Sequence, residues 1–210
     1  MEASSYSVAQ AHRPTLGNGM GVVLCNNNPT MNTPDTRPHK NSYWITEGTL
    51  MAGEYPGHPA AGNARERVAR HIEAGISFFL DLTEEDELDP YTRFLPERHP
   101  VSGLPMVHKR MPIRDVDVPK SAAEMTAILD SIDGALKEGH VVYVHCWGGR
   151  GRTGTVVGCH FVRGGSTGRE ALLQVAELWK NVEKSAWKPT SPETDEQRSF
   201  VLAWRAASAK

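Results

Sequence analysis

The 210-residue chain has little cysteine, little net charge and no long apolar run. Its three cysteines, Cys25, Cys146 and Cys159, do not make a disulfide framework, so we expect a reducing, cytoplasmic setting. No stretch approaches the roughly 20 apolar residues that span a bilayer, and no signal-peptide core is visible, so we expect no membrane span. The net charge of −2 and the lack of basic runs argue against a nucleic-acid partner.

The composition changes near residue 40. Residues 1–40 are rich in Ser, Asn, Thr, Pro and Gly without apolar periodicity, which predicts a disordered segment. The chain as a whole has 39% hydrophobic and 23% charged residues, close to globular averages. Residues 41–210 are therefore expected to form one domain of ordinary size, and nothing in them indicates an oligomeric state.

Short apolar runs alternate with helical periodicities along this domain. The apolar runs predict strands, the first two as a hairpin, at residues 43–45, 49–52, 76–80, 106 to about 112, and 141–144. The periodicities predict helices at residues 61–74, 121–136, from about 154, around 172–179 and around 200–204. Ser121 and Glu124 are typical of a capping box. The alternation indicates an α/β fold with a central, mostly parallel sheet flanked by helices.

The most informative segment is residues 145–154, which read His-Cys-Trp-Gly-Gly-Arg-Gly-Arg-Thr-Gly and follow the last predicted strand. A strand, a glycine-rich loop and a helix N-terminus together point backbone N–H groups at an anion. Glycines let the backbone approach such a ligand closely. The residues expected to ring a phosphate are Trp147, Gly148, Gly149, Arg150, Gly151 and Arg152.

Cys146 makes this loop reactive. A thiol that faces backbone amides and Arg152 is favoured as the thiolate, which is the nucleophilic form. Arg152 is expected to hold two phosphoryl oxygens, most tightly in the transition state. Thr153 is expected to donate its hydroxyl to Cys146 and help the thiolate leave, while His145 braces the loop through ring hydrogen bonds.

The whole motif, His-Cys-x5-Arg-Thr-Gly, resembles the signature of the protein tyrosine phosphatase superfamily, and residues 43–204 look compatible with its dual-specificity branch. The resemblance implies the cysteine-phosphatase fold and hydrolysis of a phosphomonoester through a cysteinyl-phosphate. It implies a phosphoprotein substrate carrying phosphotyrosine, phosphoserine or phosphothreonine, and neither a metal nor another cofactor.

The same family uses an aspartic acid on a loop that precedes the cysteine. Residues 111–119 read Met-Pro-Ile-Arg-Asp-Val-Asp-Val-Pro, and Pro-Ile-x-Asp resembles the general-acid loop of several dual-specificity enzymes. Asp115 is therefore the predicted acid and Asp117 the reserve. Arg114 either contacts substrate or pairs with a carboxylate. An acid before the nucleophile argues against low-molecular-weight tyrosine phosphatases and related arsenate reductases, in which the cysteine loop comes first.

A weaker resemblance lies at residues 193–200, which read Glu-Thr-Asp-Glu-Gln-Arg-Ser-Phe. The segment resembles the glutamine loop that positions the hydrolytic water in tyrosine-specific phosphatases. Gln197 matches the second glutamine of that loop, and Glu193 stands where the first would be. We interpret Glu193 as a structural residue near a helix N-terminus, where the macrodipole favours a carboxylate.

Arg150 leaves the substrate class open. A cation at this position resembles the phosphoinositide 3-phosphatase loop, which would suit inositol phosphates, phosphoinositides or another small phosphoester. A solvated arginine is an equal alternative, and Trp147 with its two following glycines is closer to the cyclin-dependent-kinase-associated phosphatases.

Other readings are disfavoured. A non-catalytic pseudophosphatase that binds phosphorylated partners conflicts with the retention of Cys146, Arg152 and an acid candidate. A rhodanese-like, sulfur-handling loop would not end in Arg-Thr-Gly. The acidic run at residues 81–87 is interpreted as a solvated face, and Cys159 as a small buried apolar residue.

Overall fold

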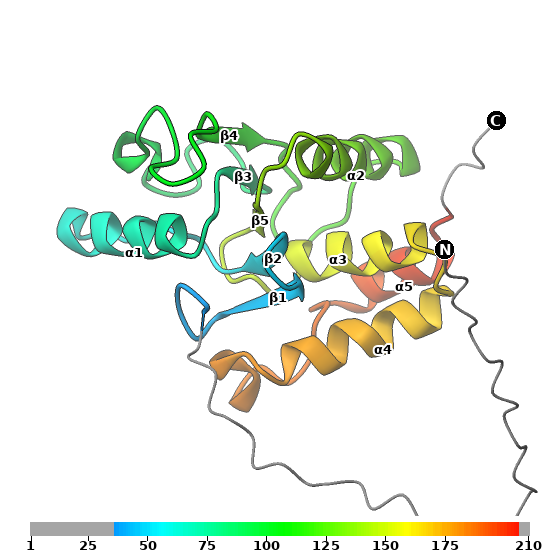
Figure 1. The fold of residues 1–210 in the computed structure, drawn as a ribbon. Helices are drawn as coiled ribbons and strands as arrows, with labels where there is room; N and C mark the ends of the chain where they lie inside the picture. The colour runs from blue at the N-terminus through cyan, green and yellow to red at the C-terminus, as the bar shows by residue number, and fades with distance from the viewer. Residues whose placement is uncertain (1–35, 206–210) are drawn as a thin grey trace, which may run out of the picture. The chain divides into compact units, whose positions relative to one another are not determined.

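A computed structural model of the protein describes residues 36–205 (Figure 1). The predicted disorder of residues 1–40 therefore lies mostly outside the described residues. Residues 36–40 form a bend and turn, in which Arg37 donates a hydrogen bond to the carbonyl of Asn181, 2.8 Å away. Among residues 36–205, no helix combines the length and the apolar character that crossing a membrane requires.

A five-stranded sheet forms the centre of the domain (Figure 1). Its strands are β1 (Ser42–Thr46), β2 (Leu50–Gly53), β3 (Phe78–Asp81), β4 (Val107–Arg110) and β5 (Val142–His145). Their spatial order is β1-β2-β5-β3-β4. β1 and β2 form an antiparallel hairpin and the other neighbouring pairs are parallel, so the predicted hairpin and mostly parallel sheet are confirmed.

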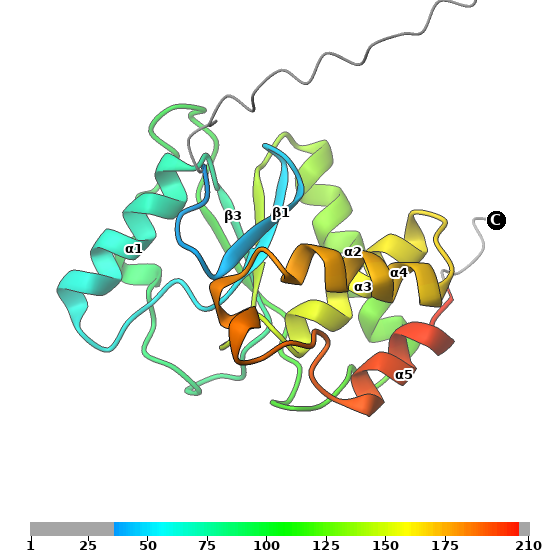
Figure 2. The same ribbon diagram turned by 90° about the horizontal axis from the view of Figure 1, so that it is seen from below.

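Helices cover both faces of this sheet. They are α1 (Ala61–Glu73), α2 (Ala122–Lys137), α3 (Arg152–Arg163), α4 (Gly168–Trp179) and α5 (Asp195–Ala203). Two short 3₁₀ helices add η1 (Thr92–Phe94) and η2 (Glu183–Ala186). α1 lies on one side of the sheet, whereas α2 and α3 lie on the other, and α4 and α5 pack on α3 (Figures 1 and 2).

The alternation of side chains along the strands accounts for these layers. In a strand, successive residues point to opposite faces of the sheet. Leu80 and Val144 belong to the core cluster that includes α2 and α3. Phe79 and Tyr143, their neighbours in sequence, belong instead to the cluster that includes Val68 of α1. Both faces are thus buried, as the short, continuous apolar runs predict.

The helix starts differ in their caps. The Ser121 hydroxyl accepts a hydrogen bond from Glu124 N, as the predicted capping box requires. The Glu124 carboxylate accepts from Lys120 N and not from Ser121 N, so the second hydrogen bond of the box is missing. α5 begins with a complete box: the Thr194 hydroxyl accepts from Gln197 N, and the Gln197 side chain accepts from Thr194 N. This second box fixes the Gln197 side chain at the N-terminus of α5, beside Gly151 of the predicted catalytic loop.

The sheet brings three loops together at one edge. The carboxyl ends of parallel strands meet there, and binding sites of α/β proteins gather outside them. β3 leads into residues 82–90, β4 into residues 111–119 and β5 into residues 146–151. The predicted acid loop after β4 and the predicted cysteine loop after β5 therefore lie at the same edge of the sheet, with the loop after β3 between them in the strand order.

Candidate active site

Residues 146–151 form a tight loop between β5 and α3. Cys146 stands at its start and is buried, with 3% of its surface exposed. Gly149 has φ +71°, and a Cβ at this position would lie 2.4 Å from the carbonyl carbon of Gly53. A side chain at residue 149 is thus excluded both by the left-handed backbone and by the close approach to β2.

The other loop residues face different neighbours. Trp147 is 58% exposed, and its carbonyl accepts a hydrogen bond from Tyr55 N at 2.9 Å. The carbonyl of Gly148 accepts one from Lys184 Nζ at 3.3 Å. Gly151 is the N-cap of α3, where a Cβ would lie 2.9 Å from the amide atoms of Gln197.

Arg152 is the first residue of α3, and its side chain is 1% exposed. Its Nη1 donates to Glu87 Oε2 at 2.8 Å and its Nη2 to Glu87 Oε1 at 2.6 Å, a bidentate pair. Nη1 also donates to the carbonyls of Ile113 at 3.1 Å and Leu82 at 3.4 Å. The guanidinium is therefore held in one orientation by the loops that follow β3 and β4.

This pairing fixes the charges of both partners. Burial alone would lower the pKa of Arg152, but the Glu87 hydrogen bonds and the electrostatic interactions with Cys146, Glu87 and Asp115 raise it above its usual range. Burial alone would raise the pKa of Glu87, but the hydrogen bonds from Arg152 and from Glu84 N lower it below its usual value. Both groups are charged at neutral pH.

Asp115 reaches the same guanidinium. Its Oδ1 lies 2.8 Å from Arg152 Nη2, and its side chain is half exposed. Asp117 differs, because its Oδ1 accepts a hydrogen bond from the backbone N of Val118 at 2.8 Å. The exposed Arg114 side chain makes no hydrogen bond or ion pair within residues 36–205. The structure thus brings the Asp115 carboxylate to Arg152, whereas the Asp117 carboxylate binds the neighbouring backbone.

His145 lies beneath the loop and is fully buried. Its Nε2 lies 2.8 Å from the hydroxyl of Tyr91, and its Nδ1 lies 3.4 Å from the carbonyl of Cys146. Burial lowers the pKa of His145 to about 4, although the nearby Asp81 carboxylate acts in the opposite direction. The ring is therefore neutral at neutral pH and has hydrogen-bonding neighbours on both sides.

Asp81, at the end of β3, is also fully buried. Its Oδ1 accepts from the hydroxyl and the backbone N of Thr83, and its Oδ2 accepts from His108 and Arg110. Burial alone would raise the pKa of Asp81, but His145 and these hydrogen bonds hold it well below its usual range. The interpretation of the acidic run as a solvated face is therefore wrong for Asp81, which is itself buried, and for Glu87, which binds the buried Arg152.

Thr153 and Cys159 both lie inside α3. The Thr153 hydroxyl is buried and has no hydrogen-bond partner among residues 36–205. Cys159 is fully buried, and burial raises its pKa to about 12, as befits a small residue of the core. The predicted apolar role of Cys159 is confirmed.

Arg150 points away from this centre. Its Nε donates to the Thr190 carbonyl at 2.6 Å, its Nη2 to the Thr190 hydroxyl at 2.9 Å and its Nη1 to Glu193 Oε1 at 2.8 Å. Arg150 and Glu193 thus pair with each other and fasten the segment before α5 to the cysteine loop. The Arg150 side chain is therefore neither a solvated arginine nor a free cation, which are the two alternatives that the sequence leaves open.

Gln197 is fully buried beside Gly151. Its Oε1 accepts from Glu193 N at 3.0 Å and from Thr194 N at 3.2 Å. Its Nε2 donates to the carbonyl of Asp117 at 3.0 Å. The side chain therefore connects the start of α5 to the acid loop.

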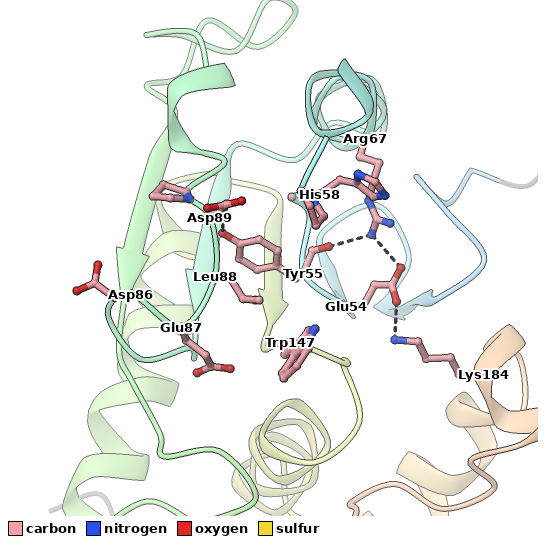
Figure 3. Close-up of a pocket in the computed structure, with 13 residues that line it drawn as sticks. Glu54, Tyr55, His58, Arg67, Asp86, Glu87, Leu88, Asp89, Trp147 and Lys184 are labelled. Atoms are coloured by element: carbon pink, nitrogen blue, oxygen red, sulfur yellow. Dashed lines mark hydrogen bonds and ion pairs between the residues drawn. The ribbon is translucent and has the colours of Figure 1, made fainter. Parts of the chain in front are cut away.

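A cleft of about 590 Å³ opens beside Trp147 (Figure 3). Tyr55 and Leu88 contribute apolar surface to it, and Asp86 and Asp89 lie on its rim. Its further lining residues are Glu54, Gly57, His58, Pro59, Arg67, Glu87, Pro90 and Lys184.

Two cations of this cleft are already paired. Glu54 binds Arg67 Nη2 at 2.8 Å through Oε1, and its other oxygen binds Lys184 Nζ (Figure 3). Burial alone would raise the pKa of Glu54, but these two partners lower it below its usual value. No sequence motif marks the roles of Glu54, Lys184, Glu87 and Tyr91, because their partners are distant in the chain.

Residues 39–201 match the family model described as the Swiss Army Knife protein, DSP-PTPase phosphatase domain. The chain is also similar to "Putative tyrosine phosphatase 067L" of Invertebrate iridescent virus 3, with 26% identity over 170 residues. That match covers 76% of this chain and 63% of the viral protein, so the chain spans less than two thirds of this relative's length.

Solved structures show the same fold. Tk-PTP in its active form is 28% identical, with a TM-score of 0.55 over 77% of this chain and 93% of that chain. PTPMT1 in complex with PI(5)P is 17% identical, with a TM-score of 0.55 over 77% of this chain and 92% of that chain. Since the family model matches more than half of the chain, the chain belongs to the dual-specificity-type branch of the protein tyrosine phosphatase superfamily.

Proposed function

We propose that this dual-specificity-type phosphatase hydrolyses phosphomonoesters through a covalent cysteinyl-phosphate on Cys146. The observation that carries the proposal is the arrangement around Arg152. A buried guanidinium, oriented by Glu87 and reached by Asp115 at 2.8 Å, begins the helix that follows the Cys146 loop. This arrangement supports a nucleophile, an anion clamp and an acid that act on one phosphoryl group.

In the first step the Cys146 thiolate attacks phosphorus, so that a sulfur–phosphorus bond forms and the bond to the leaving oxygen breaks. Asp115 gives its proton to that oxygen. In the second step water attacks phosphorus and gives a proton to the Asp115 carboxylate, and the sulfur–phosphorus bond breaks. Inorganic phosphate leaves, and the thiolate and the protonated acid are restored.

Arg152 supplies the clamp for both steps. Its Nε–H makes no hydrogen bond within residues 36–205, whereas both Nη atoms are held by Glu87. When Asp115 turns to the leaving oxygen, one N–H of Nη2 becomes free. Nε and Nη2 then form one edge of the guanidinium, which can donate to two phosphoryl oxygens. Because Glu87 fixes the plane beforehand, little reorganisation is needed as charge shifts in the transition state.

The contacts of the two aspartates favour Asp115 over Asp117 as the acid. The Asp115 carboxylate pairs with the proposed phosphate clamp, whereas the Asp117 carboxylate binds the backbone of its own turn. For Thr153, the buried hydroxyl without a partner in the described part of the chain supports the proposed donation to the departing thiolate.

For the substrate, we propose a phosphoprotein side chain. The cleft beside Trp147 offers Tyr55 and Leu88 as apolar surface for a peptide or an aryl group. Multiply phosphorylated headgroups need free cations, but Arg67 and Lys184 are paired with Glu54, and Arg150 is paired with Glu193. The rim carboxylates of Asp86 and Asp89 add repulsion for such anions.

The alternative is a phosphoinositide, an inositol phosphate or another small phosphoester. This alternative is favoured by Arg67 and Lys184, which line the cleft. A strongly anionic group there would compete with Glu54 for these two cations. A non-catalytic phosphate-binding role remains the third possibility, and it predicts no turnover at all.

One panel of assays separates these functions. The purified protein is tested with p-nitrophenyl phosphate, phosphotyrosine, phosphoserine and phosphothreonine peptides, and inositol phosphates, beside Cys146→Ser and Asp115→Asn. We expect kcat/KM to be highest for a phosphopeptide, Cys146→Ser to bind phosphate without turnover, and Asp115→Asn to lose the acid-dependent limb of the pH profile. Undiminished turnover by Cys146→Ser refutes the mechanism, and a preference for inositol phosphates refutes the substrate assignment.

A further inference from the structure

The turn that carries Asp115 is strained. The backbone N of Asp117 donates to the carbonyl of Arg114 at 3.1 Å, which closes a β-turn with Asp115 and Val116 at its centre. Val116 has φ +62°, a conformation that a β-branched residue rarely adopts. Its side chain is 55% exposed, so core packing does not hold it there. Contacts of its neighbours must therefore maintain the turn.

Two contacts fasten this turn, one on each side of Val116. On one side, the Asp115 carboxylate pairs with Arg152 at 2.8 Å. On the other side, the carbonyl of Asp117 accepts a hydrogen bond from Gln197 Nε2 at 3.0 Å. The first contact is lost whenever Asp115 turns toward a substrate, whereas the second is independent of the acid side chain.

The amide of Gln197 has a fixed orientation. Its Oε1 faces two backbone donors, Glu193 N and Thr194 N, so its Nε2 faces the carbonyl of Asp117. The side chain is fully buried and lies against Gly151 of the cysteine loop. Both lone pairs of Oε1 are used, which leaves no acceptor for an attacking water. This arrangement differs from the water-positioning role that the sequence resemblance suggests.

We infer that Gln197 is a positioning residue for the general acid: it holds the Asp117 carbonyl so that the strained turn keeps Asp115 over the Cys146 loop. The inference rests on the proposed function and adds a residue to it. Gln197 acts through the backbone of residues 115–117 and not by touching the phosphoryl group.

The kinetic signature depends on the leaving group. An acid is needed most when the leaving oxygen is basic, as in phenyl phosphate, and little when it is a good leaving group, as in p-nitrophenyl phosphate. We expect Gln197→Leu to lower kcat/KM for phenyl phosphate by about 10- to 100-fold and for p-nitrophenyl phosphate by a few-fold at most. Combined with Asp115→Asn, it should cause no further loss, because both changes remove the same function.

Thr194→Ala is the matched control. It removes the other half of the α5 capping box, in which the Thr194 hydroxyl accepts from Gln197 N, but leaves the bond to Asp117 in place. Thr194→Ala and Gln197→Leu should both lower the Tm, because each removes part of the helix cap. Only Gln197→Leu should lower kcat/KM more for phenyl phosphate than for p-nitrophenyl phosphate. Gln197→Glu is a second test, because it keeps the cap acceptor and replaces the donor to Asp117 with an oxygen.

Amide hydrogen exchange gives a readout that needs no turnover and works even if one variant folds poorly. Gln197→Glu and Gln197→Leu should lose protection at Asp117 N, whereas Thr194→Ala should keep it. Equal losses on both aryl phosphates, or unchanged protection at Asp117, overturn the inference. A lowered kcat with unchanged kcat/KM and a burst of phenol would overturn it in favour of a water-positioning Gln197. If the wild type hydrolyses neither substrate while the exchange result holds, the proposed function has failed and the positioning of the turn has not.

Discussion

Replacing Glu87 with glutamine tests the contact that orients Arg152. In the wild type, both carboxylate oxygens of Glu87 accept hydrogen bonds from this buried guanidinium, at 2.6 and 2.8 Å. Glu87→Gln keeps the size of the side chain but removes the charge and turns one acceptor into a donor. That donor then faces the Nη atoms of Arg152, which are donors themselves.

The expected loss follows from the two bonds. A hydrogen bond to a charged group contributes about 1.5–3 kcal/mol, and leaving a buried ion without its partner costs about 3–5 kcal/mol. Asp115 remains as a second, half-exposed partner of Arg152 and limits the damage. We therefore expect Glu87→Gln to lower the free energy of unfolding by about 2–4 kcal/mol, with a Tm decrease of roughly 2–4 °C per kcal/mol.

Urea unfolding at pH 7 measures this loss, and Glu85→Gln is the control. Glu85 is an exposed carboxylate of the same loop without an ion pair in the described part of the chain, so its replacement should change stability by about 0.5 kcal/mol or less. Equal stabilities of the two variants would refute the reasoning.

The same experiment has a pH dependence with a defined sign. Because Arg152 lowers the pKa of Glu87 from its ordinary 4.5, its stabilisation is complete above that value and is lost as pH falls through the lower folded value. The difference between wild type and Glu87→Gln should therefore shrink in acid.

Further predictions concern the neighbouring loops and the buried histidines. Arg150→Ala should cost about 1–2 kcal/mol of stability through Thr190 and Glu193, and should lower activity toward mono- and polyphosphorylated substrates by the same factor; a selective loss on polyphosphates would contradict the pairing. Val116→Asn should raise the free energy of unfolding by about 1 kcal/mol, because asparagine tolerates the left-handed conformation better; a destabilised variant would show that Val116 makes a favourable contact. The pKa of His145 is lowered to about 4, so the unfolded chain binds a proton below pH 6.5 that the folded protein does not. Stability should thus fall from pH 6.5 toward pH 4 by about 1.4 kcal/mol per unit for such a histidine, and a flat profile in urea titrations would contradict its buried, neutral state.

The sequence predicts the layers of the fold well because local patterns determine them. The apolar run at residues 141–144 becomes β5, and the periodicity at residues 121–136 becomes α2, each displaced by one residue. The parallel strands β4 and β5 then bring the acid loop and the cysteine loop to the same edge of the sheet, on either side of β3. Glu124 illustrates the limit, since its capping role depends on whether its carboxylate turns to Ser121 N or to Lys120 N.

The partners within the site are harder to predict. Glu87 and Arg152 are separated by 65 residues, and only the packing of the loop after β3 decides that Glu87, and not Glu85, turns inward. Arg150 looks like a free cation in the sequence until the segment before α5 supplies Glu193. Gln197 matches a water-positioning motif, yet its amide is used by three backbone groups that no local pattern specifies.

The central claim is the cysteinyl-phosphate on Cys146, and acid quenching during turnover of an aryl phosphate tests it most directly. Peptide mapping by mass spectrometry of the quenched protein should find one phosphoryl group on the peptide that contains Cys146 and none in Cys146→Ser. A phosphoryl group on another residue, or turnover by Cys146→Ser at the wild-type rate, would contradict the account.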